Sequence, residues 1–289
     1  MTSSGFFLPG DAPNVAYRNI CDKTTGPAPK ARAFIEELWL RYRGHEDPHF
    51  LRDAQTHFLE RFWEMYLAVS FMERDLKPSR EGGAGPEFSC RYMGQKIWVE
   101  AVAPGPGRGE DGVEEPEIGL ATYVPTERIL LRFTNALAEK RTRYLAAHKK
   151  GIIADQDCYV LAVNSRGIPH APYGNTLPFF VQALLPIGNP TMVINRATGE
   201  VTDSYYALRE TITKTKGAVV STTAFLDPQF SFVSAVLHSG VDCVNRPEVL
   251  GDDFVVLHNP TARRPLELSA FNWCKQYVYN NGELRVHAG

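Results

Sequence analysis

A carboxylate inside an apolar strand is the feature that most constrains this chain. Residues 85–102 contain a Gly-Pro turn, a short strand-like run, a Met-Gly-Gln turn and a second strand-like run that includes Glu100. Because successive strand residues point to opposite faces, Glu100 shares a face with Trp98 and Val102. Burying an unpaired carboxylate costs several kcal/mol, so a buried Glu100 needs a cationic partner or a metal ion. The alternative is an exposed acid on an edge strand.

The strongest helical pattern precedes this hairpin, at residues 51–74. Apolar and aromatic side chains recur from Phe58 to Leu67 at the spacing of one helix face, which is typical of a helix packed on a core. Glu64 lies off the centre of that face, one turn from Glu60. It is therefore either a solvated acid or an acid at the flank of a helix that overlooks a site.

A second helix is predicted at residues 127–149. Its apolar positions include Leu137 and Tyr144, and Lys140 falls on the same stripe. One interpretation is a lysine whose stem is buried while its ammonium reaches water. The other is a buried lysine that meets Glu100, because this helix must cover the same sheet.

The remaining patterns predict an α/β domain. Residues 158–164 are typical of a buried central strand, and residues 179–185 suggest a short buried helix. Residues 1–30 are rich in Gly, Pro and Ser and predict an extended arm or a partly disordered lead-in before a short helix at 31–43. Helix, hairpin, helix and strand in this order predict a sheet covered by helices. Further strands are expected at residues 191–195, 200–205, 218–226, 232–238, 254–258 and 284–287.

Two segments are too rich in Gly and Pro for regular structure. Residues 77–86 are interpreted as a link into the hairpin, and residues 104–125 as a long loop with many acids. Long loops inside a compact domain are uncommon and often functional. The acids of this loop would repel phosphates, so we do not interpret it as a clamp for DNA.

Composition narrows the class of protein. The formal net charge of -2 gives no global attraction to nucleic acid, so DNA binding would need a local basic patch. No apolar stretch approaches the roughly 20 residues that span a bilayer, so no membrane partner is expected. Residues 1–9 do not resemble a signal peptide. The five cysteines are far apart and include no CxxC pair, which predicts reduced thiols and a cytoplasmic location.

Two acids mark the hairpin, because Glu87 follows the Gly-Pro turn and Glu100 lies in the second run. Carboxylates held across a tight hairpin suit a hard divalent cation that keeps several waters. A nearby ammonium, for which Lys140 is the candidate, would orient or deprotonate an attacking water or stabilise developing charge.

This arrangement resembles the PD-(D/E)XK phosphodiesterase superfamily, which has a restriction-endonuclease-like fold. Pro86-Glu87 stands for the Pro-Asp pair of the family, and Glu100 stands for its second acid. The resemblance covers residues 52–164. It implies an αβββαβ core at 51–170, with a mixed sheet flanked by helices. An N-terminal arm with a short helix (1–50) precedes this core, and a C-terminal α+β extension (171–289) packs on the same sheet or core.

The sequence departs from the family pattern at Val102, where a lysine usually stands. In some members of the family the lysine lies on the following helix, as Lys140 does here. Lys96, which shares the face of Glu100, is a poorer candidate for the same role.

The resemblance implies metal-dependent hydrolysis of phosphodiesters, with DNA as the partner. Glu87 and Glu100 would bind Mg²⁺, or Mn²⁺, and the carbonyl of Ala101 would be a further ligand. Lys140 would position the water, and Glu64 would support the metal ligands. Four basic residues are candidates to follow the nucleic-acid backbone, although each by itself also suits a solvated helix face: Arg141, Arg143, Lys149 and Lys150.

Three functions remain open at this point. The first is an active nuclease acting on DNA. The second is a catalytically inactive nuclease-fold protein that serves as a nucleic-acid-binding or regulatory module, which Val102 and the mildly acidic charge favour. The third, a small-molecule enzyme, ranks lowest because the sequence has no GxGxxG after a strand, P-loop, HExxH or GxSxG motif.

Overall fold

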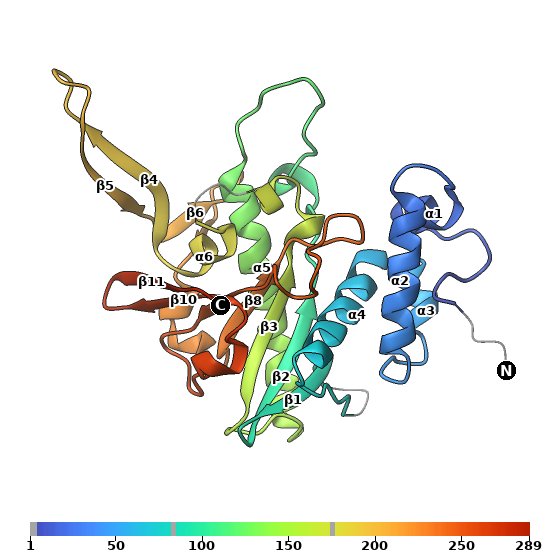
Figure 1. The fold of residues 1–289 in the computed structure, drawn as a ribbon. Coiled ribbons are helices and arrows are strands. Elements are labelled where there is room, and N and C mark those ends of the chain that lie inside the picture. Colours follow the sequence, from blue (N-terminus) through green and yellow to red (C-terminus); the bar gives the residue numbers. More distant parts are fainter. Residues whose placement is uncertain (1–4, 82–84, 174–176) are drawn as a thin grey trace.

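A mixed sheet of seven strands forms the centre of the molecule in a computed structural model, which describes residues 5–81, 85–173 and 177–289 (Figure 1). The strand order is β1-β2-β3-β8-β9-β10-β11. The pairs β2–β3, β3–β8 and β9–β10 are parallel, and the others are antiparallel. The predicted α/β class is therefore confirmed. The strands are β1 (Phe88–Tyr92), β2 (Gln95–Val102), β3 (Cys158–Asn164), β8 (Ala235–Ser239), β9 (Val255–His258), β10 (Lys275–Asn280) and β11 (Glu283–His287).

Helices cover both faces of this sheet (Figure 1). The N-terminal helices pack with Val99 on one face, whereas the later helices pack with Trp98 on the other. Because side chains alternate along β2, this strand contributes residues to the core on both faces of the sheet. The first group is α1 (Val15–Asp22), α2 (Ala28–Tyr42), α3 (Phe50–Ala54) and α4 (Phe58–Glu73), and the second is α5 (Thr126–Lys149) and α6 (Phe179–Leu184). No helix in the described part of the chain is long and apolar enough to cross a membrane.

The N-terminal region differs from the extended arm predicted for residues 1–30. Helix α1 begins after Asn14, whose side chain accepts a hydrogen bond from the backbone N–H of Tyr17. Phe6 and Tyr17 are buried, and both rings pack against Phe58 of α4. The prediction was wrong because a few aromatic anchors, spaced among Gly and Pro, order this segment on α4. The helix predicted at 51–74 is likewise divided, into α3 and α4.

Most other predicted elements are present with small changes in their bounds. Helices α5 and α6 and strands β3, β9 and β11 confirm the sequence patterns. The stretch at 218–226 is an exception, because only β7 (Val219–Ser221) is a strand and a 3₁₀ turn, η4 (Ala224–Leu226), follows it. Strand β7 pairs with β6 (Thr211–Thr213) outside the main sheet. Phe225 in η4 is fully buried, so its apolar character reflects core packing rather than a strand.

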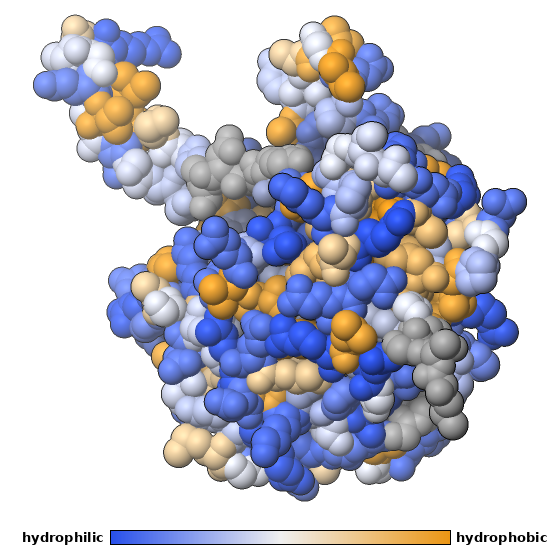
Figure 2. Space-filling model, turned by 45° about the vertical axis from the view of Figure 1, so that its right-hand side comes forward, coloured by the Kyte–Doolittle hydropathy of each residue, from blue (hydrophilic) through white to orange (hydrophobic). Residues whose placement is uncertain are grey.

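Two segments project from the same side of the molecule (Figures 1 and 2). One is the antiparallel hairpin of β4 (Ile187–Ile194) and β5 (Val201–Leu208), which carries exposed apolar side chains. The other is the loop at 104–125, where the only regular element is the 3₁₀ turn η1 (Gly109–Asp111), as its composition predicted.

Between α4 and α5 the described residues form two strands, whereas the resemblance implied three. An isolated antiparallel bridge joins Ser79 to Ser89 of β1, with two backbone hydrogen bonds of 2.8 Å. The adjacent Pro78 cannot donate to a ladder, which helps to keep the pairing short. The predicted link at 77–86 includes residues 82–84, which lie outside the described residues. After β3, strands β8 to β11 continue the same sheet rather than forming a separate one.

Candidate active site

The hairpin of β1 and β2 brings two acids to the same place. Phe88 pairs with Val99, so continuing this register by one residue sets Glu87 beside Glu100. Strand β2 lies between β1 and β3, and Glu100 is 4 % exposed. The alternative of an exposed acid on an edge strand is therefore wrong.

Lys140 on α5 is the partner of Glu100. Its Nζ donates to Glu100 Oε1 and, over 3.1 Å, to the carbonyl oxygen of Ala101. Lys140 is 5 % exposed, so its ammonium does not extend to water. Lys96 is engaged elsewhere, because it pairs with Glu81 at 2.6 Å and lies over the ring of Trp98.

Glu64 occupies a different environment, on α4. It is 4 % exposed, so the solvated acid considered from the sequence is wrong. Its carboxylate accepts hydrogen bonds from Tyr42 Oη at 2.7 Å, from Arg61 Nη1 at 2.7 Å and from Arg80 Nη1 at 2.9 Å. Burial and the neighbouring Glu64 charge raise the pKa of the Tyr42 hydroxyl, which therefore remains a donor.

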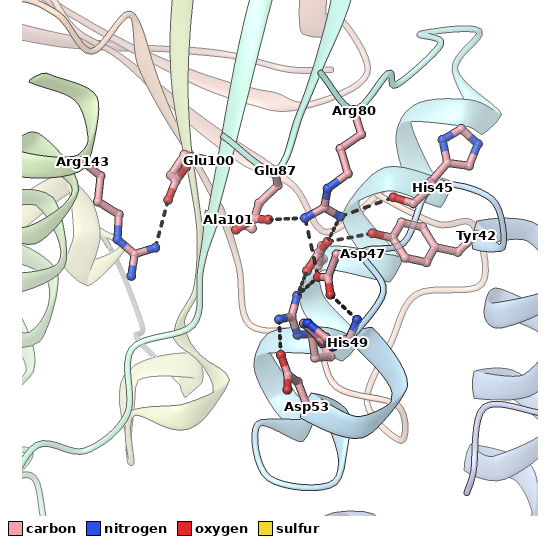
Figure 3. Close-up of polar contacts among 12 residues, drawn as sticks. Tyr42, His45, Asp47, His49, Asp53, Arg80, Glu87, Glu100, Ala101 and Arg143 are labelled. Atoms are coloured by element: carbon pink, nitrogen blue, oxygen red, sulfur yellow. Dashed lines mark hydrogen bonds and ion pairs between the residues drawn. The ribbon is translucent and has the colours of Figure 1, made fainter. Parts of the chain in front are cut away.

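Arg61 and Arg80 extend this cluster in two directions. Arg61 also pairs with Asp47 at 3.0 Å and with Asp53 at 2.9 Å, which ties α4 to the segment around α3. Arg80 lies between Glu64 and Glu87, and its Nη2 is 3.7 Å from Glu87 Oε2. Figure 3 shows Glu87 directed towards Arg80, while Glu100 is directed towards Arg143.

Glu87 is the least compensated of the three acids. Among the described residues, Arg80 at 3.7 Å is the only cation within 4 Å of its carboxylate. Burial raises the pKa of Glu87 to about 8, and the charges of Glu64 and Glu100 act in the same direction, against the cations Lys140 and Arg80. The ionised form of Glu87 is therefore incompletely compensated by the cations around it.

Two cavities meet at these acids. The larger, about 420 Å³, lies between α4, the end of β2 and α5, and Glu64, Glu87 and Lys140 line it. The smaller, about 250 Å³, is lined by Glu87 and Glu100, and Arg143 lines both. Polar groups with an open space beside them suit a reaction site.

The four predicted nucleic-acid-binding residues divide into two pairs. Arg143 and Lys150 line the smaller cavity, whereas Arg141 and Lys149 line neither of the two. Arg143 is also close to two acids, at 3.7 Å from Glu100 Oε1 and from Glu139 Oε1.

Three arginines of the site were not found from the sequence, namely Arg61, Arg80 and Arg132. Arg80 lies in the link before β1, where no periodic pattern marks it. Arg132 lines the larger cavity from α5. It precedes Lys140 by two helical turns and therefore shares its face, a signal that was present in the sequence.

A hard divalent cation would need oxygen ligands at this site. No group of three or more His, Cys, Asp or Glu side chains able to hold a metal ion occurs in residues 5–81, 85–173 and 177–289. Glu64 already accepts hydrogen bonds at both oxygens, which leaves Glu87, Glu100 and the Ala101 carbonyl as possible ligands. Mg²⁺ commonly uses only one or two carboxylates and retains several waters. Glu100 Oε1 and the Ala101 carbonyl already accept hydrogen bonds from Lys140, so an ion would have to share these oxygens with its ammonium.

Comparison with known proteins yields no match to a family model, to a curated protein or to a solved structure.

Proposed function

We propose that this protein is a metal-dependent nuclease that hydrolyses phosphodiester bonds in DNA, and that residues 51–170 form a restriction-endonuclease-like core. The observation that carries the proposal is the buried contact of Lys140 with Glu100 and the Ala101 carbonyl, beside Glu87 at the wall of an open cavity. An ammonium and two acids so placed have the chemistry of a site that binds a cation and directs a water.

The arrangement of elements supports the fold proposed for this core. Helix α4, strands β1 and β2, helix α5 and strand β3 follow one another as in the superfamily core, except that the described residues form one strand fewer between the two helices, and β2 and β3 are parallel. The bridge between Ser79 and Ser89 lies at the edge where a further antiparallel strand would pair with β1.

Each residue has a role that follows from its surroundings. Glu87 and Glu100 would hold Mg²⁺, with Mn²⁺ as the alternative, and Arg80 orients Glu87 from its anchor on Glu64. The bound ion would supply a Lewis acid that neutralises the scissile phosphate and lowers the pKa of a bound water. Lys140, fixed by two acceptors, presents the remaining donor capacity of its ammonium to the attacking water or to the phosphate oxygen that gains charge.

A cleavage assay tests this proposal. Wild type, Glu100→Gln and Glu87→Gln are incubated with supercoiled plasmid, linear duplex and single-stranded DNA in Mg²⁺, Mn²⁺ or chelator. We expect divalent-dependent cleavage by the wild type and a loss of at least about 100-fold in both variants. Glu139→Gln is the matched control, because Glu139 lines the same cavity but is 67 % exposed, and it should cleave within about threefold of wild type.

Two outcomes would contradict hydrolysis. One is the absence of cleavage under every divalent metal, and the other is equal cleavage by wild type and Glu100→Gln. Circular dichroism shows whether each variant is folded at the assay temperature. Glu87→Gln is useful here because the only ion pair it breaks among the described residues is the 3.7 Å contact with Arg80.

A catalytically inactive nuclease-fold module is the second candidate. Its specific support is that Lys140 already neutralises Glu100, so this acid needs no metal for its charge to be tolerated. Val102 in place of the usual lysine favours it as well. DNA binding by the wild type without cleavage in any metal would support this module over the nuclease.

A further inference from the structure

Arg132 is a cation in the larger cavity that has no acidic partner. Its Nε donates to the carbonyl oxygen of Gly105 at 2.9 Å. Among the described residues, no carboxylate lies within 4 Å of its guanidinium, whereas Arg61, Arg128 and Arg143 each have at least one. Arg132 is half-buried, and burial lowers the pKa of its guanidinium. A partly desolvated cation without a counter-ion favours an anion from outside.

The loop that follows β2 holds this guanidinium in place. Gly107 has φ +88°, and a Cβ atom at this position would lie 2.8 Å from Arg132 Nη1. The guanidinium therefore lies directly against the loop backbone, next to the Gly105 carbonyl and Gly107. A cation held in this way loses less side-chain entropy when it binds a ligand.

Helix α5 aligns Arg132 with the proposed reaction centre. Arg132, Lys140 and Arg143 all line the larger cavity. At a rise of 1.5 Å per residue, Arg132 lies about 12 Å before Lys140 along the helix axis and Arg143 about 4 Å after it. Lys140 thus has a cation on each side along the helix, Arg132 before it and Arg143 after it. This pattern suits a ligand with several phosphates.

We propose that Arg132 binds a non-scissile phosphate of a polynucleotide and is thereby a positioning residue for the hydrolysis. This inference rests on the proposed function, because a phosphodiester at Lys140 and a second phosphate at Arg132 belong to the same strand. It narrows the substrate class to polynucleotides that extend from the reaction centre along α5 to Arg132.

Metal-free binding tests this inference separately from cleavage. The probes are a short fluorescein-labelled DNA strand and its duplex, measured by anisotropy in chelator over a series of salt concentrations. Arg132→Gln should raise Kd about tenfold and reduce the slope of log K against log salt by about 0.7 to 0.9, the loss expected for one phosphate contact. Arg132→Lys should recover part of the affinity, since it restores the charge without the planar fork.

Arg128→Gln is the matched control. Arg128 lies one turn before Arg132 on α5, but its guanidinium is 3.8 Å from Glu114 and does not line the larger cavity. Its substitution should leave Kd and the salt slope unchanged. Gly107→Ala is a second test, because it should displace the guanidinium and weaken binding without removing a charge.

Cleavage kinetics then separate the two proposals. If the wild type cleaves DNA, Arg132→Gln should raise KM about tenfold and change kcat less than threefold, as expected for a residue that binds ground and transition states alike. If the wild type binds but does not cleave, the nuclease proposal fails while the role of Arg132 in binding stands. An unchanged Kd in Arg132→Gln, an equal change in Arg128→Gln, or no DNA binding by the wild type would overturn the inference.

Discussion

Glu64 and Glu87 lie on opposite sides of Arg80, and the two carboxylates differ in how many close partners they have. Glu64 accepts hydrogen bonds from Tyr42, Arg61 and Arg80, all at 2.9 Å or less. Glu87 has only Arg80 within 4 Å among the described residues, at 3.7 Å, and its pKa is raised to about 8. A buried carboxylate with all its hydrogen bonds made rigidifies the fold. A carboxylate without close partners can still interact with a ligand. We therefore propose that Glu64 serves the stability of the fold, whereas Glu87 serves the reaction.

The largest expected effect concerns the third acid, Glu100. Lys140→Met leaves this buried carboxylate without its cation, and we expect the free energy of unfolding to fall by about 3–5 kcal/mol. The double variant Glu100→Gln/Lys140→Met should recover much of this loss but no cleavage. Urea unfolding measures the loss in the free energy of unfolding. Lys149→Met on the same helix is the control for an exposed lysine. A loss no larger than in Lys149→Met would show that the pair is not a buried interaction.

A smaller effect tests the structural role of Glu64. Tyr42→Phe removes one donor to its carboxylate and should lower the free energy of unfolding by about 1.5–3 kcal/mol, the contribution of a hydrogen bond to a charged group. If Glu64 serves stability, cleavage by the folded variant should stay within about threefold of wild type. A loss of cleavage as large as in Glu100→Gln would instead place Glu64 among the reacting groups.

The pH dependence of stability tests Glu87 itself. Because its pKa is about 8 in the folded protein and near 4.5 in the unfolded chain, the folded state binds more protons between these values. Its contribution to the free energy of unfolding is therefore complete below pH 4.5 and is lost as the pH rises through about 8.

Glu87→Gln removes this titration from the metal-free protein. Across the same pH range the wild type should lose more than about 1 kcal/mol of stability relative to the variant. Chemical denaturation at several pH values with chelator measures the difference. Parallel pH profiles would mean that Glu87 titrates normally and is already compensated.

Arg143 should give the smallest effect. Its side chain is 62 % exposed and is 3.7 Å from Glu100, so Arg143→Gln should change the free energy of unfolding by less than about 0.5 kcal/mol. Thermal and urea unfolding measure this directly. A loss comparable to that of Lys140→Met would show that both cations, rather than Lys140 alone, neutralise Glu100.

Local sequence patterns predicted the parts of the site that depend on one strand or one helix. The period of two in β2 placed Glu100 on the same face as Trp98, and the helical stripe of α5 placed Lys140 towards the same sheet. Their meeting followed because consecutive elements of an α/β unit pack on each other. The hairpin also brought Glu87 close to Glu100, because a short turn sets the register of the two strands.

Other parts depend on contacts between distant segments. Arg80 lies in a link without periodicity, and Tyr42 lies on α2, for which only a short helix was predicted. Both reach Glu64 because α2 docks against α4 and the link crosses the end of β1. Phe6 also depends on distant contacts, because it is buried among aromatic rings of α1, α2 and α4. The Gly- and Pro-rich composition around it does not predict this burial.

The amino-acid sequence by itself determined which residues alternate along β2, which face of α5 is buried, and therefore that Glu100 and Lys140 could pair. Only the tertiary structure decided how well the charge of each carboxylate is compensated. The partners that compensate it are arginines and a tyrosine, which distant elements bring to the site. Hydrophobic periodicity is a property of neighbouring residues. Burial and the distances between charges, which determine the pKa of Glu87, are properties of the assembled fold.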